Sequence, residues 1–189
     1  MKEGLASGLS SAINLVSLAA TRNKEDILSE LIRQAERFNY TVVDVDINKP
    51  WGGYVRFDTA SAEDFAKNFF PQLDMQSIRL GRRDVDLSPK FLLVKPGARL
   101  SWQVHARRAE LWHYLTPGGY HKSNKAEHQG DLYSAPAGTE VQFSQGECHR
   151  LVGTEPSTYT LVAEIWQHTD HDNHSDENDI VRIDDDYRR

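Results

Sequence analysis

Three residues in the middle of the chain, Gln103, His105 and Glu110, carry side chains that bind divalent metal ions in proteins. Residues two apart in a β-strand point to the same face, so Gln103 and His105 can face one interior together. Glu110 follows after a turn and can join them from the next strand. An amide oxygen, an imidazole nitrogen and a carboxylate oxygen suit Zn²⁺, Mn²⁺ or Fe²⁺. The spacing therefore predicts a metal site that needs a fourth ligand from a distant strand.

The composition limits the classes of protein that could contain such a site. A chain of 189 residues, 39% of them hydrophobic, predicts one globular domain or one domain with a modest extension. The single cysteine, Cys148, excludes an internal disulfide framework and a CxxC zinc site, and it fits a reducing compartment, so a cytoplasmic protein is expected. The net charge of −6 argues against a general binder of nucleic acid or anionic membrane, because both need a cationic surface.

The first half of the chain contains the elements with helical periodicity. No apolar run approaches the roughly 20 residues that span a bilayer, and residues 1–20 predict a short amphipathic helix or a frayed leader rather than a signal peptide. Apolar residues at spacings of three and four predict a helix over 24–38, and a second helix is predicted over 61–70, with Ser61 and Asp64 spaced like a capping box. Alternating residues predict strands at 40–46 and 54–57, separated by a turn at 49–53.

The second half predicts an all-β core that positions the metal-binding residues. From Pro89 onward the pattern favours no helix, and Pro and Gly separate short alternating segments. The expected strands cover 91–94, 99–104, 111–115, 131–134, 140–143, 149–152 and 159–166. Many short strands with closely spaced turns are typical of a β-sandwich or barrel. The polar, acidic stretch from His168 predicts a solvated loop before an ordered segment at 180–183, so His168, His171 and His174 are not expected to share a metal.

The metal-binding residues resemble the first motif of the cupin superfamily, in which two ligands one residue apart precede a Glu. The second cupin motif is a Pro-x-Gly turn followed by a His, and this chain has Pro136-Ala137-Gly138 and then His149. The longer gap implies an insertion around 142–147. The resemblance implies that His149 is the fourth ligand and that the fold is all-β, a cupin double-stranded β-helix (jelly-roll) barrel. It divides the chain into an N-terminal helical extension over 1–48 and a barrel domain over 49–189.

Three segments resemble, more specifically, the bacterial type II mannose-6-phosphate isomerases. Residues 103–112 are similar to the family's Gln-x-His-His-His-Arg-Ala-Glu-His-Trp, residues 49–52 to its Arg-Pro-Trp-Gly, and residues 177–187 to its Glu-Asp-Asp-Ile-Val-Arg-Phe-x-Asp-x-Tyr. The segments occur in the family's order over about three quarters of the chain. Three histidines of the first motif are replaced by Ala106, Arg107 and Leu111. These replacements affect the identity of the substrate rather than the metal site.

The resemblance implies a metal-dependent aldose–ketose isomerase that acts on a sugar or sugar phosphate through an enediolate, with Zn²⁺ as the first choice of metal. Such an enzyme needs a base to move a proton between adjacent carbons and cations to stabilise charge or hold a phosphate. Arg108 and Arg182 match arginines of the family motifs, and Lys95 is a third candidate cation. The base stays open between His113, His121 and the carboxylates.

Two other functions fit the same residues. The cupin barrel serves many purposes, so a non-catalytic cupin that binds or senses a carbohydrate is one alternative. Another metal-dependent cupin enzyme, such as an oxygenase, is the second. In each case the expected ligand is a small molecule, with no nucleic acid or membrane partner. The resemblance to cupins also implies a homodimer.

Overall fold

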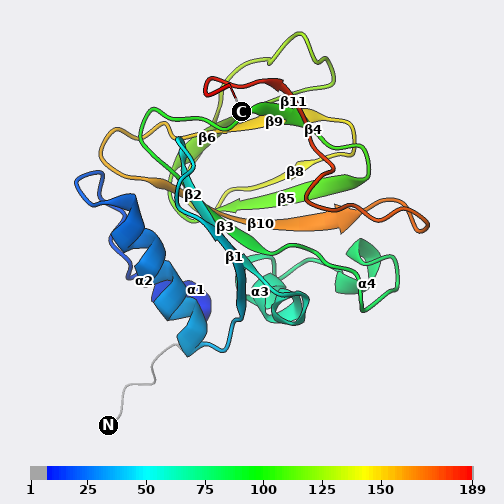
Figure 1. Cartoon of the computed structure of the whole chain (residues 1–189), viewed down its shortest axis with the longest axis horizontal. Coiled ribbons are helices and arrows are strands. Elements are labelled where there is room, and N and C mark those ends of the chain that lie inside the picture. The colour runs from blue at the N-terminus through cyan, green and yellow to red at the C-terminus, as the bar shows by residue number, and fades with distance from the viewer. Residues whose placement is uncertain (1–7, 189) are drawn as a thin grey trace.

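Two antiparallel β-sheets form the walls of a barrel in the computed structural model, which describes residues 8–188 (Figure 1). The larger sheet contains, in spatial order, β1 (Val42–Asp46), β2 (Gly52–Phe57), β3 (Lys90–Val94), β10 (Thr160–His168), β5 (Arg108–Tyr114) and β8 (Glu140–Phe143). The smaller sheet contains β11 (Val181–Asp184), β4 (Trp102–Val104), β9 (Cys148–Val152), β6 (Gly118–Ser123) and β7 (Tyr133–Ala135). The all-β core predicted from the sequence is confirmed.

Alternation along the larger sheet separates two hydrophobic cores. Every second residue of β3, β5 and β10 faces the barrel interior, where Leu92, Trp112 and Val162 are packed together. Their neighbours Phe91 and Leu161 face outward into a second core. Burying each such side chain contributes about 1.5–3 kcal/mol. A side chain's place in the alternation therefore decides whether it can reach the barrel interior.

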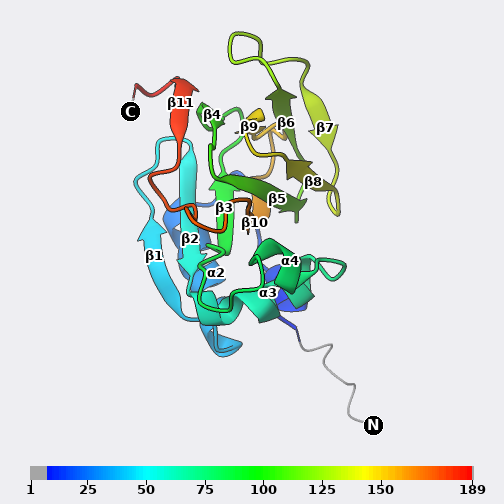
Figure 2. The same cartoon turned by 90° about the vertical axis from the view of Figure 1, so that its right-hand side faces the viewer.

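Four α-helices pack on the outer face of the larger sheet: α1 (Leu9–Ile13), α2 (Lys24–Arg37), α3 (Ala62–Phe69) and α4 (Met75–Ile78). Figure 2 shows them at the opposite end of the molecule from β4, β6, β9 and β11. The helices predicted over 24–38 and 61–70 are confirmed as α2 and α3. Ser61 occupies the N-cap position of α3, as predicted, but its side chain makes no cap hydrogen bond. In the short turn before α3, the Asp58 carboxylate accepts the Ser61 backbone N–H at 2.9 Å.

Three segments differ from the sequence predictions. Strand β6 begins at Gly118, directly after Pro117, where the Pro and Gly residues predicted a turn. Glycine is needed there because a Cβ at Gly118 would crowd Thr160. Strand β1 lies within the predicted extension, yet it pairs with β2 and enlarges the sheet. The segment from His168 is not simply a solvated loop: His168 ends β10, and Ser175 and Asp179 are buried with it. Polar partners rather than apolar packing bury this segment, so hydropathy did not reveal it.

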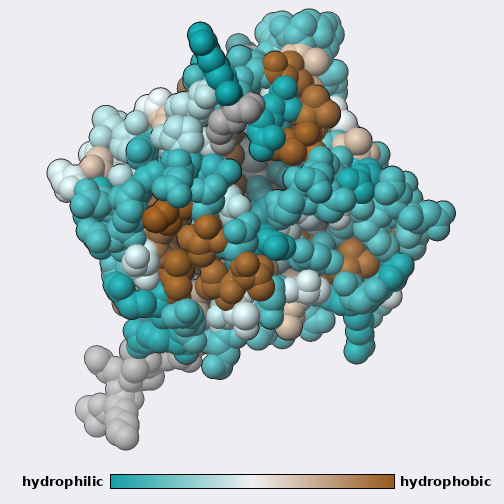
Figure 3. Space-filling model, in the orientation of Figure 1, coloured by the Kyte–Doolittle hydropathy of each residue, from teal (hydrophilic) through white to brown (hydrophobic). Residues whose placement is uncertain are grey.

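Exposed apolar residues lie mainly on the strands at the sheet edges. Val43 and Val45 on β1 and Val181 and Ile183 on β11 are exposed, and each strand ends its sheet. Figure 3 shows a largely hydrophilic face with apolar patches in the regions of β1 and β11. Exposed edge strands are the parts of a sheet at which another strand can pair. Among residues 8–188, no helix has the length and apolar character that crossing a bilayer requires.

Candidate metal centre

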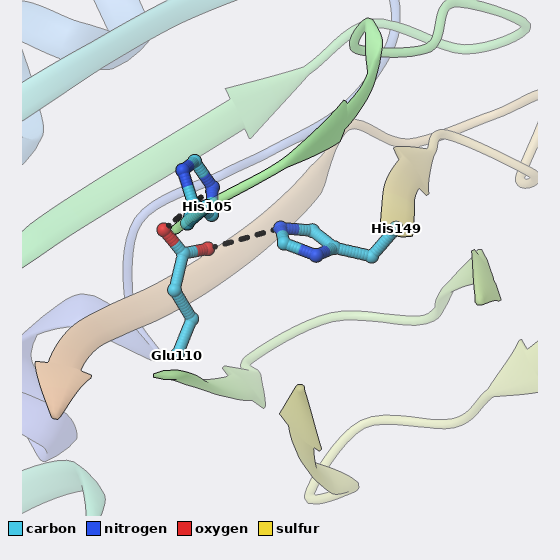
Figure 4. Close-up of side chains that lie close together, drawn as sticks. All are labelled: His105, Glu110 and His149. Atoms are coloured by element: carbon cyan, nitrogen blue, oxygen red, sulfur yellow. Dashed lines mark ion pairs between the residues drawn. The ribbon is translucent and has the colours of Figure 1, made fainter. Parts of the chain in front are cut away.

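His105, Glu110 and His149 meet inside the barrel (Figure 4). Each offers one ligand atom, and these atoms all lie within 4.8 Å of one another. His105 Nε2 is 3.1 Å from Glu110 Oε1, and His149 Nε2 is 3.2 Å from Glu110 Oε2. All three side chains are at most 2% exposed. The structure thus brings together three of the four metal ligands that the sequence predicted.

The two sheets contribute the three residues from opposite sides. Gln103 on β4 is paired with His149 on β9, so their side chains share a face of the smaller sheet, and His105 follows two residues after Gln103. Glu110 lies on β5 of the larger sheet. The insertion expected before His149 is the connection between β8 and β9. The site exists only when the two sheets are packed face to face.

Backbone carbonyls fix the tautomers of both histidines. His105 Nδ1 lies 2.5 Å from the carbonyl oxygen of Asp179, and His149 Nδ1 lies 3.0 Å from that of Glu147. A carbonyl only accepts hydrogen bonds, so each Nδ1 carries the proton. Burial, with help from the charge on Arg108, lowers the pKa of His105 to about 4 and keeps its ring neutral. Both rings therefore turn Nε2 toward Glu110, and His105 Nε2 also lies 3.3 Å from Arg108 Nη2.

The arrangement fits a divalent cation. Burial opposes ionisation of Glu110, but His105, Arg108 and His149 outweigh it and hold the pKa of this carboxyl well below its usual range. Glu110 Oε2 and His149 Nε2 are buried without a hydrogen-bond partner among the described residues. Two imidazoles and a carboxylate that converge in this way form a donor set typical of Zn²⁺, Mn²⁺ or Fe²⁺.

Gln103, the remaining predicted ligand, lies beside the cluster. Its side chain is 8% exposed and lines the same cavity as Glu110. Its amide oxygen accepts a hydrogen bond from the Ser101 hydroxyl at 2.9 Å. This contact orients the amide oxygen and occupies one of its two lone pairs. The other lone pair stays available for a ligand.

A cavity of about 260 Å³ opens next to Glu110 and extends between β2, β3, β4, β5 and β10. Its walls combine cationic, acidic, polar and aromatic side chains. The lining residues are Asp44, Lys49, Trp51, Tyr54, Lys90, Leu92, Leu100, Ser101, Gln103, Arg108, Glu110, Glu164, Glu177, Ile180 and Arg182. Such a mixture suits a small polar ligand that carries hydroxyl groups and negative charge.

Glu164 is a buried acid of this cavity that the motifs did not identify. It lies on β10, and its Oε2 accepts the Trp112 indole N–H at 3.0 Å. Lys90 Nζ lies 3.7 Å from its Oε1. Burial and the neighbouring Glu110 raise the pKa of Glu164 to about 7, against the opposing effect of Lys90. A carboxyl poised between its two protonation states at neutral pH can both take and return a proton.

The predicted cations occupy different places. Arg108 is buried beside Glu110, with Nε 2.9 Å from Glu110 Oε1, and its guanidinium lies over the Trp166 ring. Arg182 lies on the exposed strand β11, opposite Gln103 in the register of β11 and β4, and it lines the cavity. Lys95 does not line it, because alternation after β3 puts Lys95 on the opposite face from Lys90.

The histidines considered as bases also lie outside the cavity. His113 lies three positions after Glu110 on β5 and therefore points to the opposite face of the sheet. Its Nδ1 bonds to the Phe69 carbonyl in the outer core. His121 Nδ1 meets the Gly130 carbonyl at the edge of β6. His168, His171 and His174 form no further group of metal-binding side chains within residues 8–188. The acids of the cavity are thus left as candidates for the base.

Comparison with known proteins addresses the fold. No family model matches the chain, and no curated protein matches it in sequence. The capsular polysaccharide assembling protein CapF from Staphylococcus aureus is similar in structure, with a TM-score of 0.51 and 11% identity over 93% of this chain and 45% of CapF. Oxalate decarboxylase from Lactobacillus farciminis gives a TM-score of 0.48 and 16% identity over 74% of this chain and 33% of that one.

These likenesses are limited in length and in identity. The chain spans less than half the length of CapF. A protein from Klebsiella pneumoniae with a double-stranded β-helix domain gives a TM-score of 0.39 and 17% identity over 50% of this chain and 72% of that one. At such identities, similarity describes the fold rather than the chemistry. With its two antiparallel sheets, the chain has the double-stranded β-helix fold that the sequence predicted.

Proposed function

We propose that the protein is a metal-dependent aldose–ketose isomerase that acts on a sugar or sugar phosphate through an enediolate. One observation carries the proposal: Glu164, with a pKa near 7, lines the same cavity as Glu110 of the metal centre. The motifs shared with type II mannose-6-phosphate isomerases support it independently. A cation site next to a carboxyl that exchanges protons at neutral pH is what this isomerisation needs.

The proposed reaction rearranges hydrogens within one substrate. A proton leaves the carbon next to the carbonyl and is returned to the former carbonyl carbon, while a hydroxyl proton passes between the two oxygens, so no co-reactant is consumed. A divalent cation held by His105, Glu110 and His149 supplies stabilisation of the negative charge that develops on the substrate oxygens. Glu164 takes the carbon-bound proton and delivers it to the neighbouring carbon.

The surroundings of Glu164 suit that task. The Trp112 indole holds Oε2, which fixes the plane of the carboxyl group. Among the contacts within residues 8–188, Oε1 has only the longer one to Lys90, at 3.7 Å, and it is the oxygen we assign to proton transfer. Lys90 is itself held by Glu177 at 2.9 Å, so its charge stays near the carboxyl. These contacts hold the base in place before a substrate arrives.

The cavity favours a small anionic sugar. Its volume of about 260 Å³ is slightly below the roughly 300 Å³ at which typical ligand sites begin, so only a small ligand fits. Lys49 and Arg182 line it and can meet a phosphate or another negative group. Trp51 and Tyr54 offer flat apolar faces against which a sugar ring can pack.

One contact favours a second function, a non-catalytic carbohydrate-binding cupin. Arg108 lies close to the donor set, with Nε 2.9 Å from Glu110 Oε1 and Nη2 3.3 Å from His105 Nε2. The guanidinium already neutralises Glu110 in part. A binding protein could use this internal ion pair in place of a metal. In that case sugars would bind to the metal-free protein and would not turn over.

Deuterium exchange separates the two functions. Metal-loaded protein is incubated in D₂O with mannose 6-phosphate, fructose 6-phosphate, heptose phosphates and free aldoses, and proton NMR follows the C2 position. We expect exchange and interconversion with at least one of these substrates, and loss of both in Glu164→Gln. Tight binding of a sugar without exchange would favour the non-catalytic protein. Absence of exchange with every sugar would overturn the isomerase.

A further inference from the structure

The segment of residues 175–180 packs across the loop that joins β4 to β5, between His105 and Arg108. Asp179 lies near the end of this segment and is 6% exposed. Its carboxylate accepts the backbone N–H groups of Ala106 at 2.9 Å and Arg107 at 3.0 Å, and the Ser175 hydroxyl at 2.7 Å. These bonds fix the backbone of the loop between the metal ligand and the buried cation.

The backbone of Asp179 contacts the same loop at both ends. Its carbonyl oxygen accepts from His105 Nδ1 at 2.5 Å and from Arg108 Nη1 at 2.9 Å. One residue therefore sets the tautomer of His105, the direction in which its Nε2 points, and the place of the Arg108 guanidinium. Ser175 adds a second bond to Arg108, at 2.9 Å.

We propose that Asp179 is a positioning residue of the metal centre, acting on the cation through His105. The inference rests on the metal centre of the proposed function. The Asp179 carboxylate holds the backbone of residues 106 and 107. This places the backbone carbonyl of Asp179 against His105 Nδ1. A carbonyl in that position keeps the proton on Nδ1 and makes Nε2 a stronger ligand. Without the carboxylate, the loop and the ring are free to turn.

The charge of Asp179 has a second effect at this site. Its carboxylate oxygens lie 3.7 Å from Arg108 Nη1 and 3.8 Å from Arg107 Nε. The Arg108 guanidinium, which contacts Glu110, would repel a cation bound there, and the negative charge of Asp179 offsets part of that repulsion. The side chain thus aids cation binding both through geometry and through charge.

Cobalt binding tests the proposal in the full chain. Co²⁺ is titrated into the metal-free wild type, Asp179→Ala and Asp179→Asn, with visible absorption as the readout of affinity and coordination. We expect Asp179→Ala to lose about 10- to 100-fold in Co²⁺ affinity, with an altered spectrum. Asp179→Asn keeps one acceptor oxygen and the volume but not the charge, so we expect a smaller loss.

Asp186→Asn is the matched control. Asp186 also anchors the C-terminal part of the chain, through Arg99 at 2.6 Å and Arg150 at 3.4 Å, without contacting His105, Arg108 or Glu110. It should lower the melting temperature but leave Co²⁺ affinity and spectrum unchanged. Wild-type affinity in both Asp179 variants, or in Asp179→Asn if Asp179→Ala does not fold, would overturn the proposal. A wild type that binds no Co²⁺ would instead overturn the metal centre itself.

Discussion

The Nε2 atom of His149 lies 3.2 Å from Oε2 of Glu110, and both atoms are buried without a hydrogen-bond partner among the described residues. The Nδ1 atom of His149 bonds to the Glu147 carbonyl, which leaves Nε2 as the ring atom that faces Glu110. A divalent cation bound between the two atoms would give each of them the partner that it lacks. This pair of atoms is the strongest physical reason to expect a metal ion at the centre.

Glu110→Gln should abolish metal binding while keeping the fold. The amide has nearly the same shape, and its N–H₂ can donate to His149 Nε2, which removes the need for a cation. Elemental analysis after loading and dialysis should fall from about one ion per chain to background. Glu177→Gln, which changes another carboxylate of the cavity, should keep its metal. A full metal complement in Glu110→Gln would refute the ligand assignment.

Glu164→Gln should slow isomerisation by at least about 10²-fold without loss of metal, because a positioned base typically contributes 10²- to 10⁴-fold. The glutamine can still accept the Trp112 N–H, so the fold is preserved. Steady-state rates and metal content, measured on the same preparation, check both parts. The prediction fails if Glu164→Gln retains the wild-type rate of proton exchange.

The stability of the metal-free protein should depend on pH through the titration of Glu164. Its pKa is raised from 4.5 in the reference state to about 7 in the fold. The folded state therefore binds this proton more tightly, and the contribution of Glu164 to stability falls as pH rises from about 4.5 to about 7. The loss is on the order of 3 kcal/mol for such a shift. Urea unfolding at pH 5 and pH 8 should show this loss in the wild type and much less of it in Glu164→Gln.

Activity should depend on pH in the opposite sense. The base must be ionised, so the rate should rise with pH as Glu164 loses its proton. A cation that neutralises Glu110 removes one cause of the raised pKa, and the metal-loaded enzyme should therefore show its rise at a lower pH than the carboxyl titrates in the metal-free protein. Infrared titration of the Glu164 carboxyl with and without metal compares the two states. An unchanged midpoint on metal binding would contradict this coupling.

Gly52→Ala should destabilise the fold strongly. Gly52 follows Trp51 in the turn into β2 and has a φ of +153°, and an added Cβ would lie far inside contact distance of the Leu93 carbonyl oxygen on β3. The clash is with backbone, so it is relieved only by separating β2 from β3. A loss of at least about 3 kcal/mol in unfolding free energy is expected. Gly97→Ala, at a glycine of positive φ with open space around it, should cost less.

Arg182→Ala should distinguish phosphorylated from free sugars. Arg182 is exposed at the cavity and has no part in the His-Glu-His group. If it meets a phosphate, its removal should raise KM about tenfold for the phosphorylated sugar and leave kcat and the free sugar unaffected. Equal effects on both sugars would show that Arg182 does not bind the phosphate group.

Alternation and ligand chemistry made much of the centre predictable. Gln103 and His105 share a face because they are two apart, and Glu110 follows on the next strand of the chain. These three residues were found because their spacing is local and their side chains are typical metal ligands. His149 lies far from them in the sequence and was assigned only through the resemblance to the second cupin motif; the longer gap before it falls in the β8–β9 connection.

The rest depended on contacts between distant parts of the chain. Glu164 had a signal, a lone acid in the otherwise apolar segment Thr160–Trp166, but its environment comes from β3 and β5. Asp179 lies in an acidic stretch that looks solvated, and only its contacts with residues 105–108 bury it. Lys95 failed to reach the cavity because the parity of β3 puts it on the other face.

The bond between His105 and Asp179 joins residues 74 positions apart. Closing so long a loop is entropically costly, and contacts of this kind form after local ones. The centre should therefore be completed late in folding, when the barrel strands have already paired. A cation that recognises only the completed centre would then act mainly by slowing unfolding, and the metal would lengthen the lifetime of the folded chain more than it hastens its formation.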